Sequence, residues 1–485
     1  MIQTHPVTAN NSASLQVAVV GGGIAGSAAA LKLAELGANV SLFEAGPSLV
    51  NGPPACHLHA GGNLYREISD EQCLKLLEQS INTLRVFPHA VNLRPTVISV
   101  PLNDPGEPEA LLPRLRKVQA HYANLIQQDP QNQKLGPAKD YYRLYSREQL
   151  EALAKREPMQ QPQSMDDWMI PVAKYLDLSA FKFPFVQVQE YGLSLLRIAA
   201  MVKLASEGLD NCQVFTHTKV THVELLNGDK PRWRVDYQTE QGSQSTEVDY
   251  LINACGYRSG SIDDMAKLSR HRMVEFKAAY LANWPSQNGR WPELIVHGER
   301  GTTNGMAQLT PYPDGLFQLH GMTDTITLFK GGLVKSSENS AQPELSPLLT
   351  RKLTQGWQSD EVAQRTAEAV KHMSRYLPSF NNAAVAGRPL FGAQQIPGSD
   401  PSLRAASVSF DKAHYARTEI VKFSSALSAA EQIIENIAEL GLLHGEALGS
   451  VMSELPSTQQ LGYSQVLELA EQLAEQRNYP LSLAR

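Results

Sequence analysis

Three glycines near the start of the chain have the spacing of a dinucleotide-binding turn. Gly21, Gly23 and Gly26 form G-x-G-x-x-G within the stretch VAVVGGGIAGSAAA. In such a motif the first glycine permits a tight turn, and the second removes a side chain that would keep a pyrophosphate off the backbone. The third lets a helix pack closely on a strand. The free N–H groups at the helix start then face the phosphates, so we predict a dinucleotide site here.

An acidic residue at the matching distance supports this prediction. Glu44 lies 21 positions after Gly23, at the end of the apolar run NVSLFE. A carboxylate at the end of the second strand is placed to accept a hydrogen bond from a ribose 2′-hydroxyl. The alternative is a glycine-rich turn with an unrelated surface glutamate. That alternative does not account for the strand and helix on either side of the glycines.

The elements that must position these residues are readable in the flanking sequence. LQVAVV is a short apolar run that ends at glycine, as expected of a buried parallel strand. The next stretch has helical spacing and closes at Gly37, which is typical of a helix C-cap. Residues 15–46 therefore predict strand, turn, helix and strand.

The rest of the chain predicts two interleaved domains of an α/β protein. We expect helices near 70–88, 109–128 and 359–377, a capping box of Ser146 with Gln149, and a β-rich stretch over 266–335. A chain of 485 residues exceeds what one core holds. We predict a Rossmann-like FAD-binding domain (15–92, 185–265 and 361–440), an interleaved α+β substrate or cap domain (93–184 and 266–360), and a helical tail (441–485).

Composition narrows the classes of partner. The formal net charge is −6, which gives no electrostatic reason to expect nucleic acid. The four cysteines have no metal-ligand spacing, and the histidines predict no metal site. The polar start of the chain does not have the pattern of a secretory signal, and we expect a reduced, cytoplasmic protein. We predict no transmembrane segment, while peripheral membrane contact stays compatible with the sequence.

Three features favour FAD over a nicotinamide cofactor. The motif lies at the N-terminal end of a long chain whose parts interleave, and a second strand-to-glycine element, LINACG, follows some 230 residues later. No second G-x-G-x-x-G marks a separate nicotinamide domain.

With these residues in place, the chain resembles the D-amino acid oxidase-like (DAO) family of FAD-dependent oxidoreductases. GGGIAG with Glu44 is the first matching patch, and HLHAGGNL is the second. The resemblance implies that His59, Gly61 and Gly62 pass the flavin ring. In dimethylglycine- and sarcosine-dehydrogenase-like members a histidine in this segment carries the flavin covalently. His59 is thus a candidate for covalent attachment or, alternatively, a residue that lines the pocket.

Two later patches imply further cofactor contacts. CQVFTHTKVTHVE is similar to the segment whose strand places a valine backbone against adenine, and Val220 is the matching position. INACG is similar to N-A-T/A-G, in which Ala254 and Gly256 pass close to the cofactor. Cys255 replaces the usual Thr or Ala, and we interpret it as a small buried thiol rather than a redox group.

Two arginines match positions on the substrate side of the family. AGRP resembles A-G-L-R-P, which supplies an arginine to the substrate carboxylate, so Arg388 is a candidate anchor or, equally, a loop-pinning residue. HYARTEIVKFSS resembles the closing segment H-x-R-x-G-I-x-x-A-P, and Arg417 matches a second arginine. Glu419 replaces the family's glycine, which puts the local backbone approach in doubt.

The resulting prediction is a flavoenzyme that oxidises a small carboxylate-bearing amine, amino acid or 2-hydroxyacid. His320 is a candidate base, since imidazole titrates near neutral pH. The electrons would pass to oxygen or a quinone. A flavin monooxygenase or halogenase is an alternative, but the GD pair typical of those enzymes is absent before the last helix. A non-enzymatic binding protein on the same fold, like the Rab GDP-dissociation inhibitors, is the other alternative.

Overall fold

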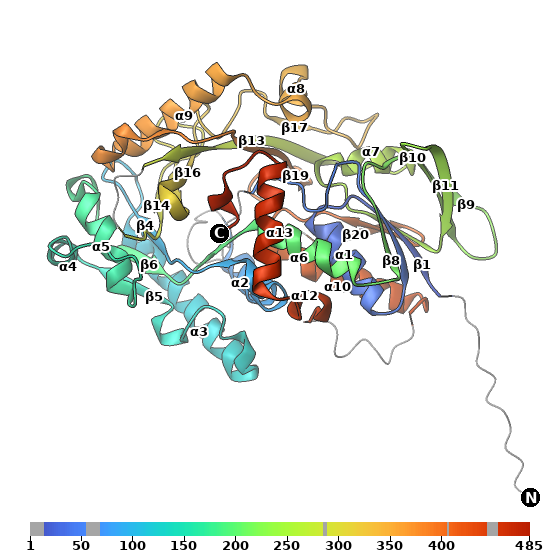
Figure 1. The fold of residues 1–485 in the computed structure, drawn as a ribbon, viewed down its shortest axis with the longest axis horizontal. Coiled ribbons are helices and arrows are strands. Elements are labelled where there is room, and N and C mark those ends of the chain that lie inside the picture. The colour runs from blue at the N-terminus through green and yellow to red at the C-terminus, as the bar shows by residue number, and fades with distance from the viewer. Residues whose placement is uncertain (1–13, 55–67, 285–288, 405–406, 444–453) are drawn as a thin grey trace, which may run out of the picture.

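Two sheets of different kinds form the two parts of the molecule (Figure 1). The computed structural model describes residues 14–54, 68–284, 289–404, 407–443 and 454–485. One sheet has six strands, is mostly parallel, and contains the strand that precedes the glycine turn. The other has ten strands and is mostly antiparallel. The chain crosses between the two sheets several times, so each is built from separate stretches of sequence.

The six-stranded sheet runs in the order β20-β21-β12-β1-β2-β8. All neighbours pair in parallel except β20 and β21, which are antiparallel. The strands are largely buried, as a parallel sheet covered on both faces requires. Their bounds are β1 Gln16–Val20, β2 Asn39–Phe43, β8 Cys212–Phe215, β12 Tyr250–Asn253, β20 Val408–Lys412 and β21 Tyr415–Thr418.

Helices cover one face of this sheet and a small sheet covers the other. The helical layer contains α1 Ile24–Glu35, α2 Asp70–Val86, α6 Leu195–Glu207 and α10 Ala426–Glu439. The second face packs on an antiparallel sheet of β9 Lys219–Leu226, β10 Arg232–Thr239 and β11 Gly242–Val248, together with α7 Ser259–Met265. This is the predicted Rossmann-like α/β architecture.

The ten-stranded sheet runs in the order β17-β13-β16-β15-β14-β4-β6-β5, and β18 and β19 also pair with β13. Its strands are β4 Thr96–Ser99, β5 Tyr142–Tyr145, β6 Phe185–Val188, β13 Arg272–Asn283, β14 Glu293–Val296, β15 Ala307–Pro311, β16 Leu316–Gly321, β17 Leu333–Lys335, β18 Ala384–Val385 and β19 Leu390–Pro397. β3 Val91–Asn92 and β7 Gly192–Leu193 form a separate short pair.

The two faces of the ten-stranded sheet have different surroundings, because side chains alternate along a strand. On β13, Tyr280 and Ala282 belong to an outer core that includes residues of α5 Met165–Tyr175 and α9 Ser359–Ser374. Ala279 and Leu281 belong instead to the core shared with the helices of the six-stranded sheet. We call this second side the inner face, since it is turned toward the nucleotide-binding part. Helices α3 Leu112–Gln128, α4 Arg147–Leu153 and α8 Pro347–Gln355 complete the fold.

Several local predictions are confirmed and one domain limit is revised. α2 begins after Ser69, whose side chain accepts a hydrogen bond from the Gln72 N–H, and Ser146 forms the predicted capping box with Gln149. The limit predicted at residue 361 is too early. β19 pairs with β13 over eight residues, and α9 packs on the same sheet, so the nucleotide-binding part resumes only at β20.

The C-terminal stretch returns to the start of the chain. Its described part contains α12 Pro456–Gln459 and α13 Tyr463–Gln476, and α13 lies against α6 (Figure 1). After α13, the Arg477 guanidinium donates hydrogen bonds to the carbonyl oxygens of Leu49 and Val50, each 3.0 Å, and to the Ser48 hydroxyl at 3.1 Å. The loop after β2 is therefore held by the end of the chain.

Candidate functional site

The three motif positions are glycine for two different structural reasons. A Cβ on Gly26 would lie 1.9 Å from the Gly21 carbonyl oxygen. Gly21 has a φ of 104°, and a Cβ there would lie 2.5 Å from the Ala254 oxygen. Both positions are thus required by packing. A Cβ on Gly23 would meet no described heavy atom within 4 Å, so this glycine leaves space in front of the start of α1. That space fits a pyrophosphate facing the free N–H groups of the helix.

The Glu44 carboxylate is fixed beside this turn. Its Oε2 accepts a hydrogen bond of 2.7 Å from the Gly22 N–H, and its Oε1 accepts one of 2.5 Å from the Gly46 N–H. The two bonds join the turn after β1 to the loop after β2. Each carboxylate oxygen has two lone pairs, so the group retains capacity for a ribose hydroxyl. The geometry fits the sugar of a dinucleotide bound along the turn.

The other predicted cofactor residues lie on neighbouring strands of the same part. Val220 is buried on β9, in a cluster with Phe43 at the end of β2. The Thr218 N–H donates to the Glu44 carbonyl oxygen at 2.9 Å, which places the start of β9 beside the acidic residue. Ala254 follows β12 and lies against the glycine turn, and Gly256 takes a φ of 56° just after it. Their roles toward a cofactor stay predictions.

Cys255 has the environment of an inert thiol. Its Sγ donates a hydrogen bond of 3.2 Å to the carbonyl oxygen of Val20. Burial, helped by the nearby Glu44 and Asp263 carboxylates, raises the pKa of this thiol to about 12. A thiol that stays protonated at neutral pH is a poor nucleophile. The hydrogen bond and the raised pKa support the interpretation of Cys255, which is partly buried, as a small thiol rather than a redox group.

Arg417 does not reach an open site. Its side chain is fully buried on β21, and its Nε donates to both carboxylate oxygens of Asp263 at 2.8 Å. Its Nη1 donates to Asp411 at 2.5 Å and to the Ser409 hydroxyl at 2.6 Å. Two carboxylates therefore already neutralise this guanidinium. The prediction that Arg417 anchors a substrate is corrected: the arginine joins β21 to α7 and β20.

Arg388 lies on the surface near the chain end. It is exposed, its Nη1 donates to the Arg477 carbonyl oxygen at 3.1 Å, and its guanidinium carbon lies 4.9 Å from the centre of the Tyr479 ring. It also lines a surface pocket of about 630 Å³ that includes Trp357 and Phe391. Both aromatic residues pack with the outer core. This environment favours the loop-pinning alternative over the substrate anchor.

A buried polar surface lies on the inner face of the ten-stranded sheet. Directly opposed residues share a face, and the pairs Leu281 with Gln318, Thr310 with Gln318, and Gln308 with His320 extend the inner face onto β15 and β16. We call Gln308, Thr310, Gln318 and His320 the polar sheet face. Buried polar groups are normally hydrogen-bonded, and these four form a polar surface on the side of the sheet that is turned toward the nucleotide-binding part, so we take this surface as the candidate substrate side.

His320 is thus placed at a polar surface, as a site residue would be. The Tyr312 hydroxyl donates to Gln318 Oε1 at 3.1 Å, which turns Gln318 Nε2 toward His320 Nδ1 at 3.2 Å. A neutral His320 then carries its proton on Nε2. The sequence had predicted only the histidine. The missed residues had a readable signal, because AQLTP and LFQLHG place a polar residue at every second position.

The inner face continues onto β13, where it adjoins the nucleotide-binding part. Lys277 Nζ lies 2.7 Å from Glu275 and 3.2 Å from Gln394 Oε1, and burial lowers the pKa of this lysine. Gly392 of β19 pairs with Lys277, and a Cβ at Gly392 would lie 3.4 Å from Pro53, in the loop after β2. The polar inner face and the loop that follows the acidic strand are therefore neighbours.

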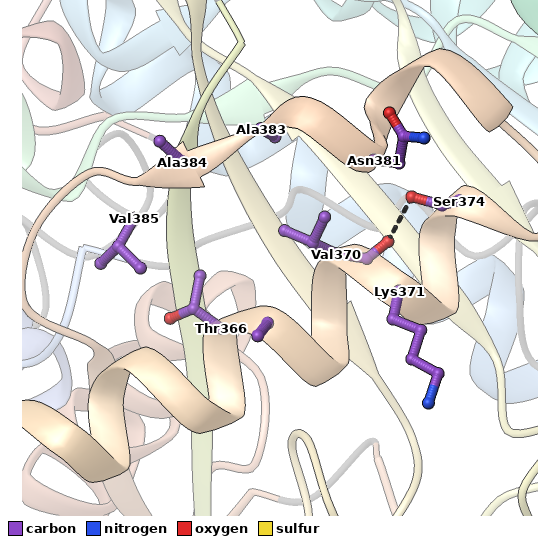
Figure 2. A pocket seen from close by; sticks show the side chains of 9 residues that line it. Thr366, Val370, Lys371, Ser374, Asn381, Ala383, Ala384 and Val385 are labelled. Carbon is purple, nitrogen blue, oxygen red and sulfur yellow. Dashed lines mark hydrogen bonds between the residues drawn. The ribbon is translucent and has the colours of Figure 1, made fainter.

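A further hollow lies on the opposite side of the sheet (Figure 2). It has a volume of about 430 Å³ and is lined mainly by α9 and the segment before β18. Thr366, Val370 and Val385 contribute to it, and Lys371 extends away from the other labelled side chains. Its lining offers no group suited to redox chemistry.

Some predicted residues lie outside the described part. His59, Gly61 and Gly62 fall in the stretch 55–67, so their roles toward the flavin stay predictions. Among the described residues no group of three or more His, Cys, Asp or Glu is arranged to hold a metal ion. No helix within the same ranges is long and apolar enough to cross a membrane.

The comparison with known families agrees with the geometry of the glycine turn. Residues 16–178 match the family described as "FAD dependent oxidoreductase" (DAO). No curated protein matches the sequence.

Solved structures with the same fold include an oxidase, a dehydrogenase and a deaminase. L-alpha-glycerophosphate oxidase from Mycoplasma pneumoniae, with FAD bound, is 14% identical with a TM-score of 0.54, over 88% of this chain and 95% of that chain. L-proline dehydrogenase from P.horikoshii is 13% identical with a TM-score of 0.55, over 90% and 96%. L-amino acid deaminase from Proteus vulgaris is 14% identical with a TM-score of 0.53, over 91% and 96%. At these identities the likeness concerns the fold.

Proposed function

We propose that this chain, whose residues 16–178 match the FAD dependent oxidoreductase (DAO) family, oxidises a small carboxylate-bearing amine, amino acid or 2-hydroxyacid. In this reaction the substrate carbon loses a hydride and its amine or hydroxyl loses a proton, which yields an imine or a carbonyl. Bound FAD supplies the acceptor for the hydride. The main support for this proposal is the buried polar sheet face, which adjoins the part of the molecule that contains the glycine turn.

The cofactor is held, in this proposal, by the residues around the turn. The open space at Gly23 and the N–H groups of α1 receive the pyrophosphate, and Glu44 accepts the ribose hydroxyl. Val220 contributes its backbone on the adenine side, and Ala254 and Gly256 border the cofactor at the end of β12. The short approach at Gly26 explains why the turn tolerates no side chain there.

The substrate is placed, in this proposal, between the flavin and the polar sheet face. Two of the compared proteins are named for L-proline and L-amino acids, and one is named for L-alpha-glycerophosphate. L-Proline and L-amino acids carry a carboxylate beside an amine, which supports the proposed class, whereas glycerophosphate carries a phosphate near a hydroxyl. His320 takes part in the proton transfer. Its Nε2 proton makes it a hydrogen-bond donor, and it accepts a proton at Nδ1 only if the Gln318 amide turns away.

Covalent attachment of the flavin through His59 stays part of the proposal. If the bond exists, acid precipitation leaves the yellow colour on the polypeptide. Colour found only in the supernatant removes this step, and a His59→Ala variant with colour still on the polypeptide assigns the bond elsewhere. The electron acceptor is oxygen or a quinone. The rate of flavin reoxidation by each, after reduction by substrate, distinguishes them.

The main test uses the purified protein. Its absorbance spectrum is expected to show oxidised flavin, and anaerobic mixing with amino acids, N-methyl amino acids and 2-hydroxyacids is expected to bleach it for one class. A protein that stays colourless and takes up no added FAD contradicts the flavoenzyme. A coloured protein that none of the three classes reduces contradicts the proposed substrate, but not the cofactor.

A further inference from the structure

Arg94 is a buried arginine with two guanidinium nitrogens that make no hydrogen bond to any described residue. It lies between β3 and β4 and is only 6% exposed. Within the described ranges, its Nε and Nη2 atoms are buried and make no hydrogen bond. A guanidinium stays charged at every physiological pH, and it is costly to bury without partners. The Nε and Nη2 groups of Arg94 are therefore placed to donate to a further hydrogen-bond acceptor.

Glu293 balances the charge of Arg94 without satisfying its donors. The Arg94 Nη2 lies 3.6 Å from Glu293 Oε2, which is longer than a hydrogen bond. The other oxygen of Glu293 accepts a hydrogen bond from Gln308 Nε2, on the polar sheet face. The pair is thus close to neutral, which lets the fold tolerate the buried charge. The planar donor edge of the guanidinium stays available for a second carboxylate.

The position of Arg94 connects it to the candidate substrate side. Its guanidinium carbon lies 5.5 Å from the centre of the Tyr312 ring, and the hydroxyl of that tyrosine donates to Gln318. Gly192 makes room for the guanidinium, since a Cβ there would lie 2.4 Å from Arg94 Nη2. Arg94 thus lies beside the Tyr312 ring, and hydrogen bonds lead from the hydroxyl of that tyrosine through Gln318 to His320.

We propose that Arg94 binds the carboxylate of the substrate and determines the specificity of the enzyme for acidic substrates. This inference rests on the proposed function. The carboxylate anchor is then Arg94 and neither of the two arginines that match the family pattern. Arg417 is paired with Asp263 and Asp411, and Arg388 lies on the surface. A monoanionic carboxylate suits this environment better than a phosphate dianion, because Glu293 already offsets the single positive charge.

The test measures ligand binding to the FAD-loaded protein rather than turnover. Acetate, propionate and benzoate are titrated by calorimetry, with the corresponding uncharged amides and inorganic phosphate as comparisons, and the flavin spectrum is recorded in parallel. The wild type is expected to bind at least one carboxylate and not its amide. Arg94→Gln is expected to weaken that binding at least tenfold, and Arg94→Lys less, because lysine keeps the charge but not the planar fork.

Two further variants keep the result interpretable. Gly192→Ala, which places a methyl group against the guanidinium, is expected to weaken carboxylate binding while Arg94 remains, and it serves if Arg94→Gln does not fold. Arg85→Gln removes an arginine with a side chain that is only 8% exposed and that pairs with Asp129 at 2.7 Å, and this variant is expected to bind carboxylates like the wild type.

The outcomes separate this inference from the proposed function. Carboxylate binding that is equal in the wild type, Arg94→Gln and Gly192→Ala overturns the assignment of Arg94. So does a wild type that binds no carboxylate, or phosphate binding that depends on Arg94 and exceeds that of every carboxylate. In each of these cases the protein still carries FAD. A protein that does not bind FAD overturns the proposed function instead.

Discussion

Asp263 accepts two hydrogen bonds from the Nε of Arg417, both 2.8 Å long, at a place where neither side chain is exposed. The same carboxylate accepts a hydrogen bond from the Tyr415 hydroxyl at 2.7 Å and pairs with Arg272 of β13. One acidic residue of α7 therefore ties strand β21 of the six-stranded sheet to strand β13 of the ten-stranded sheet.

Removal of either partner of this ion pair should destabilise the protein strongly. Arg417→Met leaves Asp263 and Asp411 with less compensation, and Asp263→Asn leaves two buried guanidinium groups short of an anion. We expect each change to lower the free energy of unfolding by about 3–5 kcal/mol. Urea unfolding measures it. Arg234→Gln, which breaks an exposed ion pair with Glu224, should cost less than about 1 kcal/mol. Equal losses in the buried and exposed variants would contradict the prediction.

Two alanine substitutions in the glycine turn should have different effects. Gly26→Ala places a Cβ 1.9 Å from the Gly21 oxygen, so it should destabilise the apoprotein as well as abolish FAD binding. Gly23→Ala meets open space, so the apoprotein should keep its stability within about 0.5 kcal/mol and still lose FAD affinity. Melting curves and FAD titration separate the two effects.

A matched control for Gly23 is available at another helix start. Gly462 is the N-cap of α13, and a Cβ there also meets no heavy atom within 4 Å. Gly462→Ala should leave FAD affinity unchanged. If Gly23→Ala binds FAD as the wild type does, the pyrophosphate does not lie at this position.

Glu44→Gln should weaken FAD binding by roughly tenfold, because one of the two N–H groups that now face a carboxylate would face an NH₂ group instead. The same conflict should lower the stability of the apoprotein by about 1–3 kcal/mol. FAD affinity is measured by quenching of flavin fluorescence. Glu224→Gln, an exposed change on β9, serves as the control and should alter neither quantity. An unchanged affinity in Glu44→Gln would remove the carboxylate from the ribose site.

The buried thiols should make the protein less stable at alkaline pH. Burial raises the pKa of Cys73 and Cys212 to about 11 and that of Cys255 to about 12, from an ordinary value of 9.0. Above pH 9 the unfolded chain loses these protons and the folded chain keeps them, so the free energy of unfolding falls as the pH rises toward about 11–12. Below pH 9 the effect is absent.

The matching experiment compares urea unfolding at pH 8 and pH 10.5. The loss of stability between pH 8 and pH 10.5 should be smaller in Cys255→Ala than in the wild type. Part of the loss should remain in the variant, because buried tyrosines also have raised pKa values. A loss of the same size in both proteins would mean that the Cys255 thiol titrates normally in the folded state.

The sequence predicted well what neighbouring residues determine. The glycine spacing, the distance to Glu44 and the capping box of Ser146 are local patterns, and each reports directly on a turn, a strand end or a helix start. The small thiol at Cys255 was also readable, because it follows a short apolar strand and directly precedes a glycine.

What remained unpredictable depends on partners far along the chain. Arg417 looks like a substrate anchor in its segment, and only the fold brings Asp263 to it from 154 positions away. Likewise, the pairing of Gly392 with Lys277 moves β19 into the ten-stranded sheet, although no local pattern assigns that segment to either domain. Arg94 belongs to no sequence motif, and only the structure shows that its Nε and Nη2 groups are buried without a hydrogen bond to the described part of the chain.

The hydrogen bonds that Arg477 donates to the loop after β2 have a consequence for the order in which the fold is completed. The three hydrogen bonds from this side chain reach Ser48, Leu49 and Val50, which follow the acidic strand. Residue 477 is synthesised at least 427 positions after these three residues. The N-terminal Rossmann unit is thus made first but receives these contacts last. Loss of a stretch that includes Arg477, through an early stop codon or a protease, should therefore affect the cofactor side of the molecule, which was synthesised much earlier.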